Sequence, residues 1–480
     1  MTIKLQQLDN NRWRIPRQGA MLSDGLIYAS EAMIPKLHRE QALEQVYNVA
    51  CLPGIVGPAL AMPDIHWGYG FPIGGVAAFD AEAGVVSPGG VGYDINCGVR
   101  LLRSALTAEQ IKPHLPQLAD ALFQEVPSGV GSHRRNFKLS DSDLSQVLTE
   151  GAGWAVKKGY GSASDLECIE NNGALAGADP EKISARAMER GRNQLGTLGS
   201  GNHFLEIQEV EAIHDEAAAQ TLGLFCGQVT VSIHTGSRGL GYQVCDDSLK
   251  GMLKAARKYN ISLPDRQLCC APLTSPEAAD YLAAMACAAN FAFANRQLIC
   301  DQTRDVFSQV MDMGEAELRL NTIYDVCHNI AKWEKHRIDG KERKLCVHRK
   351  GATRAFPPGH PELPAAYRGI GQPVLVPGDM GRYSYVLTGT AGAYEQTFGS
   401  CCHGAGRVMS RHAAKKAARG HDIIGELAQQ GILVRAAGRG TVAEEMPSAY
   451  KDVAEVVKVV EQAGLGKIVA RLRPLAVIKG

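Results

Sequence analysis

The chain has 480 residues, of which 45% are apolar and 21% are charged, an ordinary composition for a globular protein. Its 51 basic and 50 acidic residues nearly cancel, which excludes a protein that binds nucleic acid through its overall charge, so an RNA partner would have to contact a local basic patch. No apolar run reaches the roughly 18 residues of a membrane span, so we expect no membrane-spanning segment and no membrane partner. The 13 cysteines lack paired CxxC spacing and indicate reduced thiols, so we expect a cytoplasmic protein.

The first predicted element is a helix over residues 34–49, where apolar side chains recur at helical spacing after Ser30 as a candidate N-cap. The character changes over residues 61–103, where short strand-like runs at 76–79 and 99–102 alternate with loops rich in Gly and Pro. Such a density of glycine indicates close packing of the backbone around a site.

The remainder of the chain is predicted to mix helices and strands. Residues 107–192 are expected to be mostly helical, with helix starts at Thr107 and at Asp179-Pro180. The further predicted strands cover residues 205–210, 229–234, 322–327, 345–349 and 468–479. The further predicted helices cover residues 276–311, 404–418 and 449–462. No polar linker rich in Pro or Ser separates these elements, so no domain boundary is predicted.

The stretch FGSCCHGAGRVMSR at residues 398–411 indicates a phosphate-binding site. His403 is followed by two glycines that bracket an alanine, and a helix predicted to begin near Ala405 would direct its free amides at an anion. A glycine-rich turn with a structural His403 remains an alternative on these residues alone. Four arginines beside glycines or helix starts are candidates for phosphate contacts or are ordinary surface charges: Arg190, Arg238, Arg407 and Arg411.

A second group of residues has the chemistry of metal ligands. Cys97 follows Asp94 by three residues, so that a thiolate and a carboxylate from one turn can reach a common ion. His203, His234 and His328 each stand at a junction of a strand and a loop. Each histidine alone could be a satisfied core residue, but together the five would suffice for two divalent ions that share a sulfur. Ligand type does not choose among Mn, Zn, Fe and Co.

These motifs resemble the RtcB family of RNA-splicing ligases along nearly the whole chain. The resemblance implies a single compact α+β domain over residues 1–480, with mixed sheets surrounded by helices around a central dinuclear metal site. Its motifs occur in one order along the chain: PDIHWGYGFPIGG (63–75), GYDINCGVR (92–100), LGSGNHFLE (198–206), HTGSRGLG (234–241), HRKGATRA (348–355), FGSCCHGAGRVMSR (398–411) and the terminal Lys479-Gly480.

Enzymes of this family join RNA that ends in a 2′,3′-cyclic phosphate or a 3′-phosphate to RNA with a 5′-hydroxyl, using GTP and two Mn²⁺ ions. The resemblance implies that His403 takes GMP from GTP as a covalent adduct, which then activates the RNA 3′-phosphate as an RNA-ppG end. It implies that Cys97 bridges the two ions, with Asp94 and His203 on one ion and His234 and His328 on the other.

The resemblance also implies further contacts. Asn202 would contact the reacting phosphate, and Tyr450 would stack on the guanine. The residues implied to bind GTP or GMP are Asn202, Glu206, Asp379, Ser384, His403, Ala405, Gly406, Tyr450 and Lys479. The arginines implied to contact RNA phosphates are Arg190, Arg238, Arg407 and Arg411.

One loop departs from the family pattern. Asp379 stands where the family usually has serine, and bulky Arg382 and Tyr383 follow, so we expect altered triphosphate affinity or metal dependence. The implied partners are GTP and RNA, either tRNA exon halves or broken RNA, with an activator of the archease type as a further possibility and no DNA as main substrate. Two alternatives are a dinuclear metal phosphoesterase that only opens cyclic phosphates and a non-catalytic RNA-repair scaffold.

Overall fold

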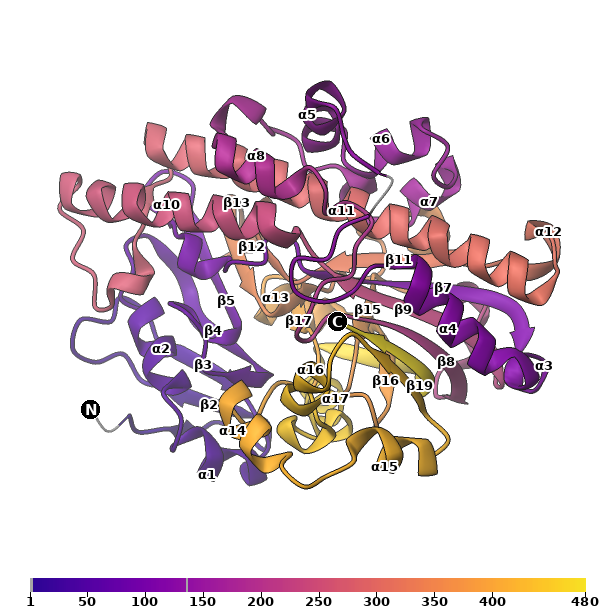
Figure 1. The fold of residues 1–480 in the computed structure, drawn as a ribbon. Coiled ribbons are helices and arrows are strands. Elements are labelled where there is room, and N and C mark those ends of the chain that lie inside the picture. Colours follow the sequence, from indigo (N-terminus) through magenta and orange to yellow (C-terminus); the bar gives the residue numbers. More distant parts are fainter. Residues whose placement is uncertain (1–2, 135–136) are drawn as a thin grey trace.

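Two large β-sheets carry the fold, and helices surround them (Figure 1). The computed structural model describes residues 3–134 and 137–480. Most strand pairs are antiparallel, but β3 pairs with β4 and β18 pairs with β19 in parallel. The predicted α+β class with mixed sheets is therefore confirmed.

The seven-stranded sheet is built mainly from the N-terminal part of the chain and is completed by a hairpin from its middle. This hairpin, β12 and β13, turns at Asp339-Gly340 and pairs with β5. In spatial order the strands are β1 (Gln6–Gln7), β2 (Arg12–Ile15), β3 (Gly25–Tyr28), β4 (Ile55–His66), β5 (Ile73–Asp80), β13 (Lys341–Lys350) and β12 (Asn329–Ile338).

The eight-stranded sheet positions most of the candidate site residues. Its path runs β11 (Asn321–Cys327), β7 (Gly98–Thr107), β9 (Gln228–Thr235), β8 (Phe204–Ile213), β19 (Gly466–Lys479), β16 (Ser384–Gly389) and β15 (Pro373–Val376), with β18 (Leu433–Ala436) beside β19. Two small sheets pair β6 (Val85–Val86) with β10 (Ala271–Pro272) and β14 (Ala352–Arg354) with β17 (Ser400–Cys402).

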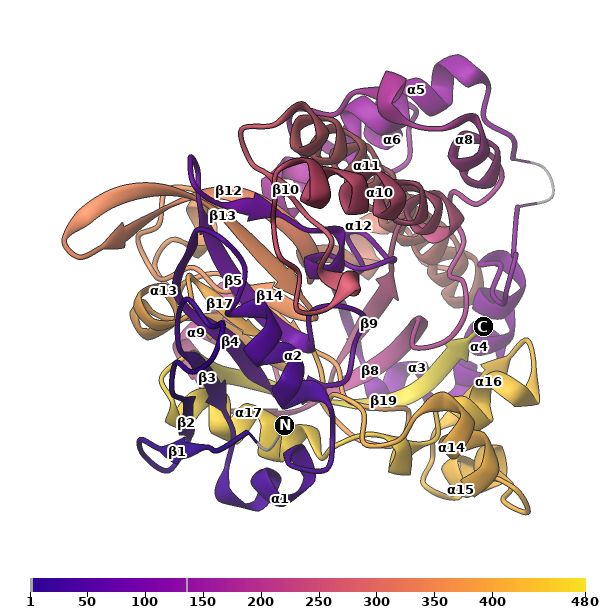
Figure 2. The same ribbon diagram turned by 90° about the vertical axis from the view of Figure 1, so that its left-hand side faces the viewer.

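Long helices cover one side of the molecule. α10 (Arg238–Lys258) and α11 (Pro276–Met311) lie side by side, and α5 (Asp141–Glu150), α6 (Ala152–Lys157) and α8 (Ala185–Gly191) pack against them (Figures 1 and 2). The other helices are α1 (Ile34–Leu37), α2 (Ala42–Val49), α3 (Ala108–Ile111), α4 (Leu115–Glu125), α7 (Ala163–Glu167), α9 (Glu216–Leu222), α12 (Glu315–Leu318), α13 (Ala391–Gln396), α14 (Arg411–Ala417), α15 (Ile423–Gln429), α16 (Arg439–Glu444) and α17 (Val453–Gln462).

Apolar packing holds α4 and α11 against one face of the eight-stranded sheet. Leu118 and Leu122 of α4 and Ile299 of α11 share a buried cluster with Ile207 of β8 and Val231 of β9. Burying side chains of this size stabilises the fold by about 1.5–3 kcal/mol each relative to leaving them exposed. None of the helices in the described part of the chain combines the length and apolarity needed to cross a membrane.

Most predicted elements are confirmed, and three have wrong boundaries. The helix predicted over residues 34–49 is split into α1 and α2, because turns with i→i+3 hydrogen bonds end α1 after Leu37. Ser30, the candidate N-cap, precedes a 3₁₀ turn and makes no capping hydrogen bond. The helix predicted from Ala449 begins only at Val453, where Asp452 caps it.

The third correction concerns the phosphate-binding stretch. The helix predicted over residues 404–418 is wrong in its first half, because α14 begins only at Arg411 after Ser410 as its N-cap. Gly406 has φ +74°, and a Cβ there would lie 2.2 Å from the Asp64 carbonyl oxygen, so this segment passes against the backbone of β4. Arg407 then forms an isolated β-bridge with Tyr450. Close backbone packing therefore replaces the predicted helix N-terminus.

Candidate active site

The candidate metal ligands come from strand ends at one edge of the eight-stranded sheet. β7 pairs antiparallel with both β9 and β11, so its first residues lie beside their last ones. Cys97 immediately precedes β7, His234 lies near the end of β9, and His328 follows β11. His203 immediately precedes β8, whose first residue, Phe204, pairs with His234. The sheet register thus brings together histidines that are far apart in sequence.

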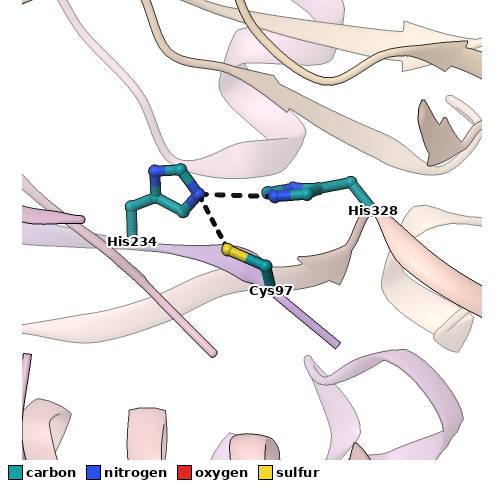
Figure 3. A group of neighbouring side chains, drawn as sticks. All are labelled: Cys97, His234 and His328. Atoms are coloured by element: carbon teal, nitrogen blue, oxygen red, sulfur yellow. Dashed lines mark hydrogen bonds between the residues drawn. The ribbon is translucent and has the colours of Figure 1, made fainter. Parts of the chain in front are cut away.

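Two groups of donor atoms result, and Cys97 belongs to both. Cys97, His234 and His328 form one group and Asp94, Cys97 and His203 the other, with the donor atoms of each within 4.8 Å of one another. Figure 3 shows the first group, whose side chains point toward one another. The Cys97 Sγ lies 3.3 Å from His234 Nε2 and 3.4 Å from His203 Nε2, and the two Nε2 atoms of His234 and His328 are 3.4 Å apart.

The spacing and chemistry of these donors fit divalent ions. Ligands at metal distances of about 2.1–2.3 Å in a tetrahedral site lie about 3.4–3.8 Å from one another, close to the separations around Cys97. Burial lowers the pKa values of His234 and His328 well below the usual range, so both imidazoles are neutral and can donate lone pairs. One thiol, one carboxylate and three imidazoles form a borderline set suited to Mn, Fe, Co or Zn.

Neighbouring groups fix the second group of donor atoms. The Asp94 Oδ2 lies 2.8 Å from His203 Nε2, and the His203 Nδ1 lies 3.1 Å from the Leu198 carbonyl oxygen, which orients the ring. Burial opposes the charge of Asp94, but His203 and Cys97 outweigh it and bring its pKa to about 2. Burial and the Asp94 charge raise the pKa of the Cys97 thiol well above its usual range. A cation is therefore what would convert this thiol to a thiolate.

His403 is held from the other sheet by Asp64 of β4. One carboxylate oxygen of Asp64, Oδ2, lies 2.6 Å from His403 Nδ1 and accepts from the backbone N–H groups of His403 at 3.0 Å and Gly404 at 3.3 Å. A carboxylate only accepts, so Nδ1 carries the proton and Nε2 has the lone pair. The His403 and His328 ring centres are 4.9 Å apart, which places His403 beside the metal ligands.

Sequence reasoning missed the role of Asp64 and of its neighbours. Asp64 belongs to the motif at residues 63–75, but no sequence spacing connects it with His403, which is 339 residues away. The Nδ1 of His66 lies 2.9 Å from the Asp64 carbonyl oxygen, and burial lowers the pKa of this imidazole to about 3. Lys451 donates to the carbonyl oxygen of Pro63 at 3.1 Å, so a partly buried ammonium also supports this segment.

A cavity of about 370 Å³ joins these groups, a volume within the range of small-molecule sites. It lies between the two sheets, since its walls include His66 and Ile73 from one sheet and Phe204 and Val477 from the other. The predicted site residues that line it are Asp94, Cys97, Asn202, Glu206, His234, His328, Asp379, Ser384, His403, Ala405, Gly406, Arg407, Arg411, Tyr450 and Lys479.

Comparison with known proteins identifies the family. A family model described as tRNA-splicing ligase RtcB matches residues 45–480. The chain belongs to the RtcB family. It is 55% identical over 478 residues to the tRNA-splicing ligase RtcB of Archaeoglobus fulgidus, covering 99% of each chain, and 53% identical to that of Thermococcus kodakarensis, covering 100% of this chain and 99% of the other. The RNA-splicing ligase RtcB of Mycobacterium tuberculosis is 54% identical over 439 residues, 91% of this chain and 100% of that one.

In this RtcB chain the candidate base pocket contains buried ionisable side chains. Glu206 is buried in β8, where it accepts from the Gln208 amide at 2.6 Å, and burial raises its pKa to about 8 even though Lys479 opposes the shift. Burial lowers the pKa of Lys479. Tyr450 lines the cavity and has the Arg407 guanidinium 5.0 Å from its ring centre. Such a pocket offers an acid, an ammonium and an aromatic face to a polar base.

Asp379, which is expected from the sequence to depart from the family pattern, lies in the cavity wall. It is 8% exposed and pairs with Arg382 at 2.7 Å, and its second oxygen accepts from the Gly381 backbone at 3.0 Å. Burial raises the pKa of Asp379 despite this pairing. Asp379 also contributes to the raised pKa of Glu206, so the two acids repel each other.

The four candidate arginines differ in their surroundings. Arg411 lines the cavity with an exposed side chain, whereas Arg407 pairs with Glu445 at 3.1 Å and donates to the Glu444 carbonyl oxygen at 2.7 Å. Arg238 is not among the described residues that line the cavity; it lies behind His203, with 3.5 Å between its Nη1 and the histidine Nδ1. Arg190 also lies outside the lining, and its guanidinium covers the ring of Tyr242 at 5.1 Å.

Proposed function

We propose that the chain, acting as one ligase domain over residues 1–480, is a GTP- and Mn²⁺-dependent RNA ligase. It joins RNA ending in a 2′,3′-cyclic phosphate or a 3′-phosphate to RNA with a 5′-hydroxyl. The RtcB relatives, whose printed names are tRNA-splicing or RNA-splicing ligase, support RNA as the substrate. The two donor groups around Cys97 support a pair of metal ions.

The observation that carries the proposal is the contact between His403 and Asp64. Their 2.6 Å separation places the proton on Nδ1, and the hydrogen bonds of the described residues give Nε2 no protein partner. His403 also lines the cavity that contains the candidate base pocket. An imidazole that is held by a carboxylate at Nδ1, with Nε2 left free beside donor groups that would hold cations, is the arrangement that nucleophilic attack on a phosphate requires.

Three bond exchanges follow from this arrangement. His403 Nε2 attacks the GTP α-phosphorus, and the bond to pyrophosphate breaks, leaving GMP on the histidine. An oxygen of the RNA 3′-phosphate then attacks that phosphorus and releases the histidine, which forms RNA-ppG. Finally the 5′-hydroxyl attacks the RNA 3′-phosphorus, a 3′,5′-phosphodiester forms, and GMP leaves. A cyclic end is first opened by water.

The bound metal ions would supply charge neutralisation for the attacked phosphate and activation of water. Asp94, Cys97, His203, His234 and His328 would hold them. Asp64 holds the His403 ring in one tautomer and stabilises the positive charge that develops on it as Nε2 bonds to phosphorus. The N–H of Gly404 also donates to Asp64, so the chain around the nucleophile is fixed at two successive residues.

The remaining predicted site residues would bind the nucleotide and the RNA. Glu206 would accept from the N–H groups on the guanine edge, with Lys479 and Ser384 beside it and Tyr450 stacked on the base. Asn202 would contact the reacting phosphate, and Ala405 and Gly406 would lie against the ribose, with Asp379 near the phosphates. The residues proposed to contact RNA phosphates are Arg190, Arg238, Arg407 and Arg411.

The proposal extends to partners and compartment. tRNA exon halves or broken RNA would be the substrates, and an archease-type protein is a proposed activator. All 13 cysteines are unpaired, and most are buried, which supports a reducing compartment such as the cytoplasm.

The test begins with enzyme, Mn²⁺ and GTP labelled at the α-phosphate. We expect an acid-labile label on the wild-type protein and none on His403→Ala, while His412→Ala, an exposed histidine of α14, keeps the label. A label that persists in His403→Ala would refute the assigned nucleophile.

The second part of the test supplies RNA with a cyclic phosphate end, RNA with a 5′-hydroxyl, GTP and each divalent metal in turn. We expect joined RNA that requires GTP, with Mn²⁺ the most effective metal. Opening of the cyclic phosphate without joining would instead establish a phosphoesterase. A protein that neither binds metal nor turns over RNA would instead be a scaffold.

A further inference from the structure

The centre of α11 contains a buried cation that the proposed reaction does not use. Arg296 has no exposed surface, and α11 around it packs apolar side chains such as Phe293 and Ile299 into the core. A buried guanidinium is costly unless its donors are paired. Arg296 is paired throughout, and its partners lie next to the candidate metal ligands.

The guanidinium joins two strands, β9 and β11, to the turn that precedes β7, at the edge that carries the candidate metal ligands. Its Nη1 donates to the carbonyl oxygens of Asn96 at 2.9 Å and Thr235 at 3.0 Å, and its Nη2 donates to the Asn96 side-chain oxygen at 3.1 Å. Its Nε lies 3.0 Å from both carboxylate oxygens of Asp325 in β11. Asn96 precedes Cys97 and Thr235 follows His234, so one side chain fixes the backbone beside two donor atoms.

The backbone around Cys97 needs such support. Asn96 has φ +52°, the left-handed region that non-glycine residues adopt at a cost. Its side chain is also anchored, because its Nδ2 donates to the Ala289 carbonyl oxygen of α11 at 2.7 Å. Gly98 lies directly against the cation, since a Cβ there would be 3.1 Å from the Arg296 Cζ and 2.2 Å from the Val326 carbonyl oxygen. The turn that presents the thiol is thus built around Arg296.

We propose that Arg296 is a positioning residue for the metal centre. It fixes the Cys97 sulfur and the His234 imidazole at the separation that their shared ion requires before that ion arrives. Outer groups that orient metal ligands typically contribute 10–100-fold in metal affinity. The inference rests on the proposed metal site, and it adds a residue that contacts neither metal nor substrate.

A purely structural role for a buried ion pair is the competing explanation, and α11 contains a matched control. Arg304, two turns further along, is largely buried and pairs with Asp165, with 2.6 Å between its Nη2 and Oδ1, and it donates to the Leu320 carbonyl oxygen at 2.8 Å. None of these partners is adjacent in sequence to a candidate metal ligand. Arg304→Lys therefore perturbs a comparable ion pair without touching the metal-binding turn.

The experiment compares Arg296→Lys with Arg304→Lys. Lysine keeps the charge that Asp325 requires, but its single ammonium does not reproduce the planar fork that bonds Asn96, Thr235 and Asp325 together. Each purified protein is stripped of metal and titrated with Co²⁺, and binding is followed by the thiolate-to-cobalt charge-transfer absorption. We expect about 10–100-fold weaker Co²⁺ binding in Arg296→Lys, with an altered band, and wild-type binding in Arg304→Lys.

The outcomes separate the inference from the function on which it rests. A wild-type protein without a charge-transfer band would overturn the thiolate-bound metal site itself. A wild-type band that Arg296→Lys reproduces at equal affinity would overturn only the positioning role, as would an equal loss in Arg304→Lys.

Asn96→Gly is the second variant in case Arg296→Lys does not fold. Glycine tolerates the left-handed backbone and removes one acceptor of the cation and the bond to Ala289. Circular dichroism verifies its fold. We expect weaker Co²⁺ binding from this variant too, and unchanged affinity in a folded Asn96→Gly would count against the inference.

Discussion

Replacing Asp64 by Asn tests the geometry of the proposed nucleophile most directly. The carboxylate accepts three hydrogen bonds, from His403 Nδ1 and from two successive backbone N–H groups. Losing the charge weakens each of these three bonds by roughly 1 kcal/mol. The summed loss of about 3 kcal/mol, expressed in the transition state, corresponds to about a 100-fold slower transfer of GMP to the protein. Should the amide nitrogen face Nδ1, the ring must carry its proton on Nε2, and the loss approaches the ~10⁴-fold seen when a catalytic-triad Asp becomes Asn.

The assay is single-turnover labelling with saturating α-labelled GTP and Mn²⁺. We expect Asp64→Asn to label about 10²–10⁴-fold more slowly than wild type while it binds Co²⁺ with the wild-type charge-transfer band. Asp80→Asn is the control, because Asp80 lies at the end of the neighbouring strand β5 and pairs with Arg343 near the surface. Wild-type labelling by a metal-loaded Asp64→Asn protein would refute the tautomer argument.

Three further predictions test the metal site, the base pocket and the atypical loop. Cys97→Ala should lose both GMP labelling and RNA joining, because Cys97 is the donor that the two candidate metal-binding groups share. Cys287→Ala, which changes a buried cysteine of α11, should keep both activities. Turnover by Cys97→Ala would exclude a bridging thiolate. Glu206 has a folded-state pKa of about 8 against 4.5 for the free side chain, so the unfolded chain releases its proton first and wild-type stability falls as pH rises through this window. Glu206→Gln should therefore gain on the order of 1 kcal/mol per pH unit over wild type in chemical unfolding between about pH 5.5 and 7.5, while losing GMP transfer; parallel stability curves would disprove the raised pKa. Asp379→Ser removes a negative charge from the cavity wall and should lower the KM for GTP several-fold, with Asp379→Asn behaving alike; an unchanged KM in both would show that the triphosphate does not approach this loop.

The local elements of the site could be predicted from the sequence, but their meeting could not. Strands are predicted from the sequence at 205–210, 229–234 and 322–327, and these runs lie within β8, β9 and β11. Nothing in that periodicity indicates that β7 lies between β11 and β9, and only this order places His234 beside His328. The family resemblance supplied the grouping because it carries long-range information that hydrophobic periodicity lacks.

The error at residues 404–418 has a different cause. From Ala405 to Ala418 the composition favours a helix, and a propensity argument extends that helix back to the glycines. The chain instead follows the backbone of β4 at Gly406 and bridges to Tyr450, so tertiary contacts override local preference. The same contacts place Asp64 against His403. The wrong boundary and the missed acid therefore have one origin, the approach of two segments more than 300 residues apart.

Arg296 shows what a correct helix prediction leaves undetermined. The Ser275-Pro276 start and the Ala-rich stretch after it predict a long helix over residues 276–311, and the structure confirms it as α11. The helix nevertheless buries Asn290, Asn295 and Arg296 together with its apolar side chains. A buried polar side chain must find partners, and a helix whose backbone groups already bond internally has to find them on another element. Asn290 finds its partners at the carbonyl oxygens of Leu148 and Leu175, away from the candidate metal ligands. Asn295 and Arg296 find theirs beside those ligands: Asn295 donates to the Thr197 carbonyl oxygen at 3.0 Å, and Arg296 donates to those of Asn96 and Thr235. Two of the three polar residues that look out of place in the helix pattern thus connect the core to the candidate metal site.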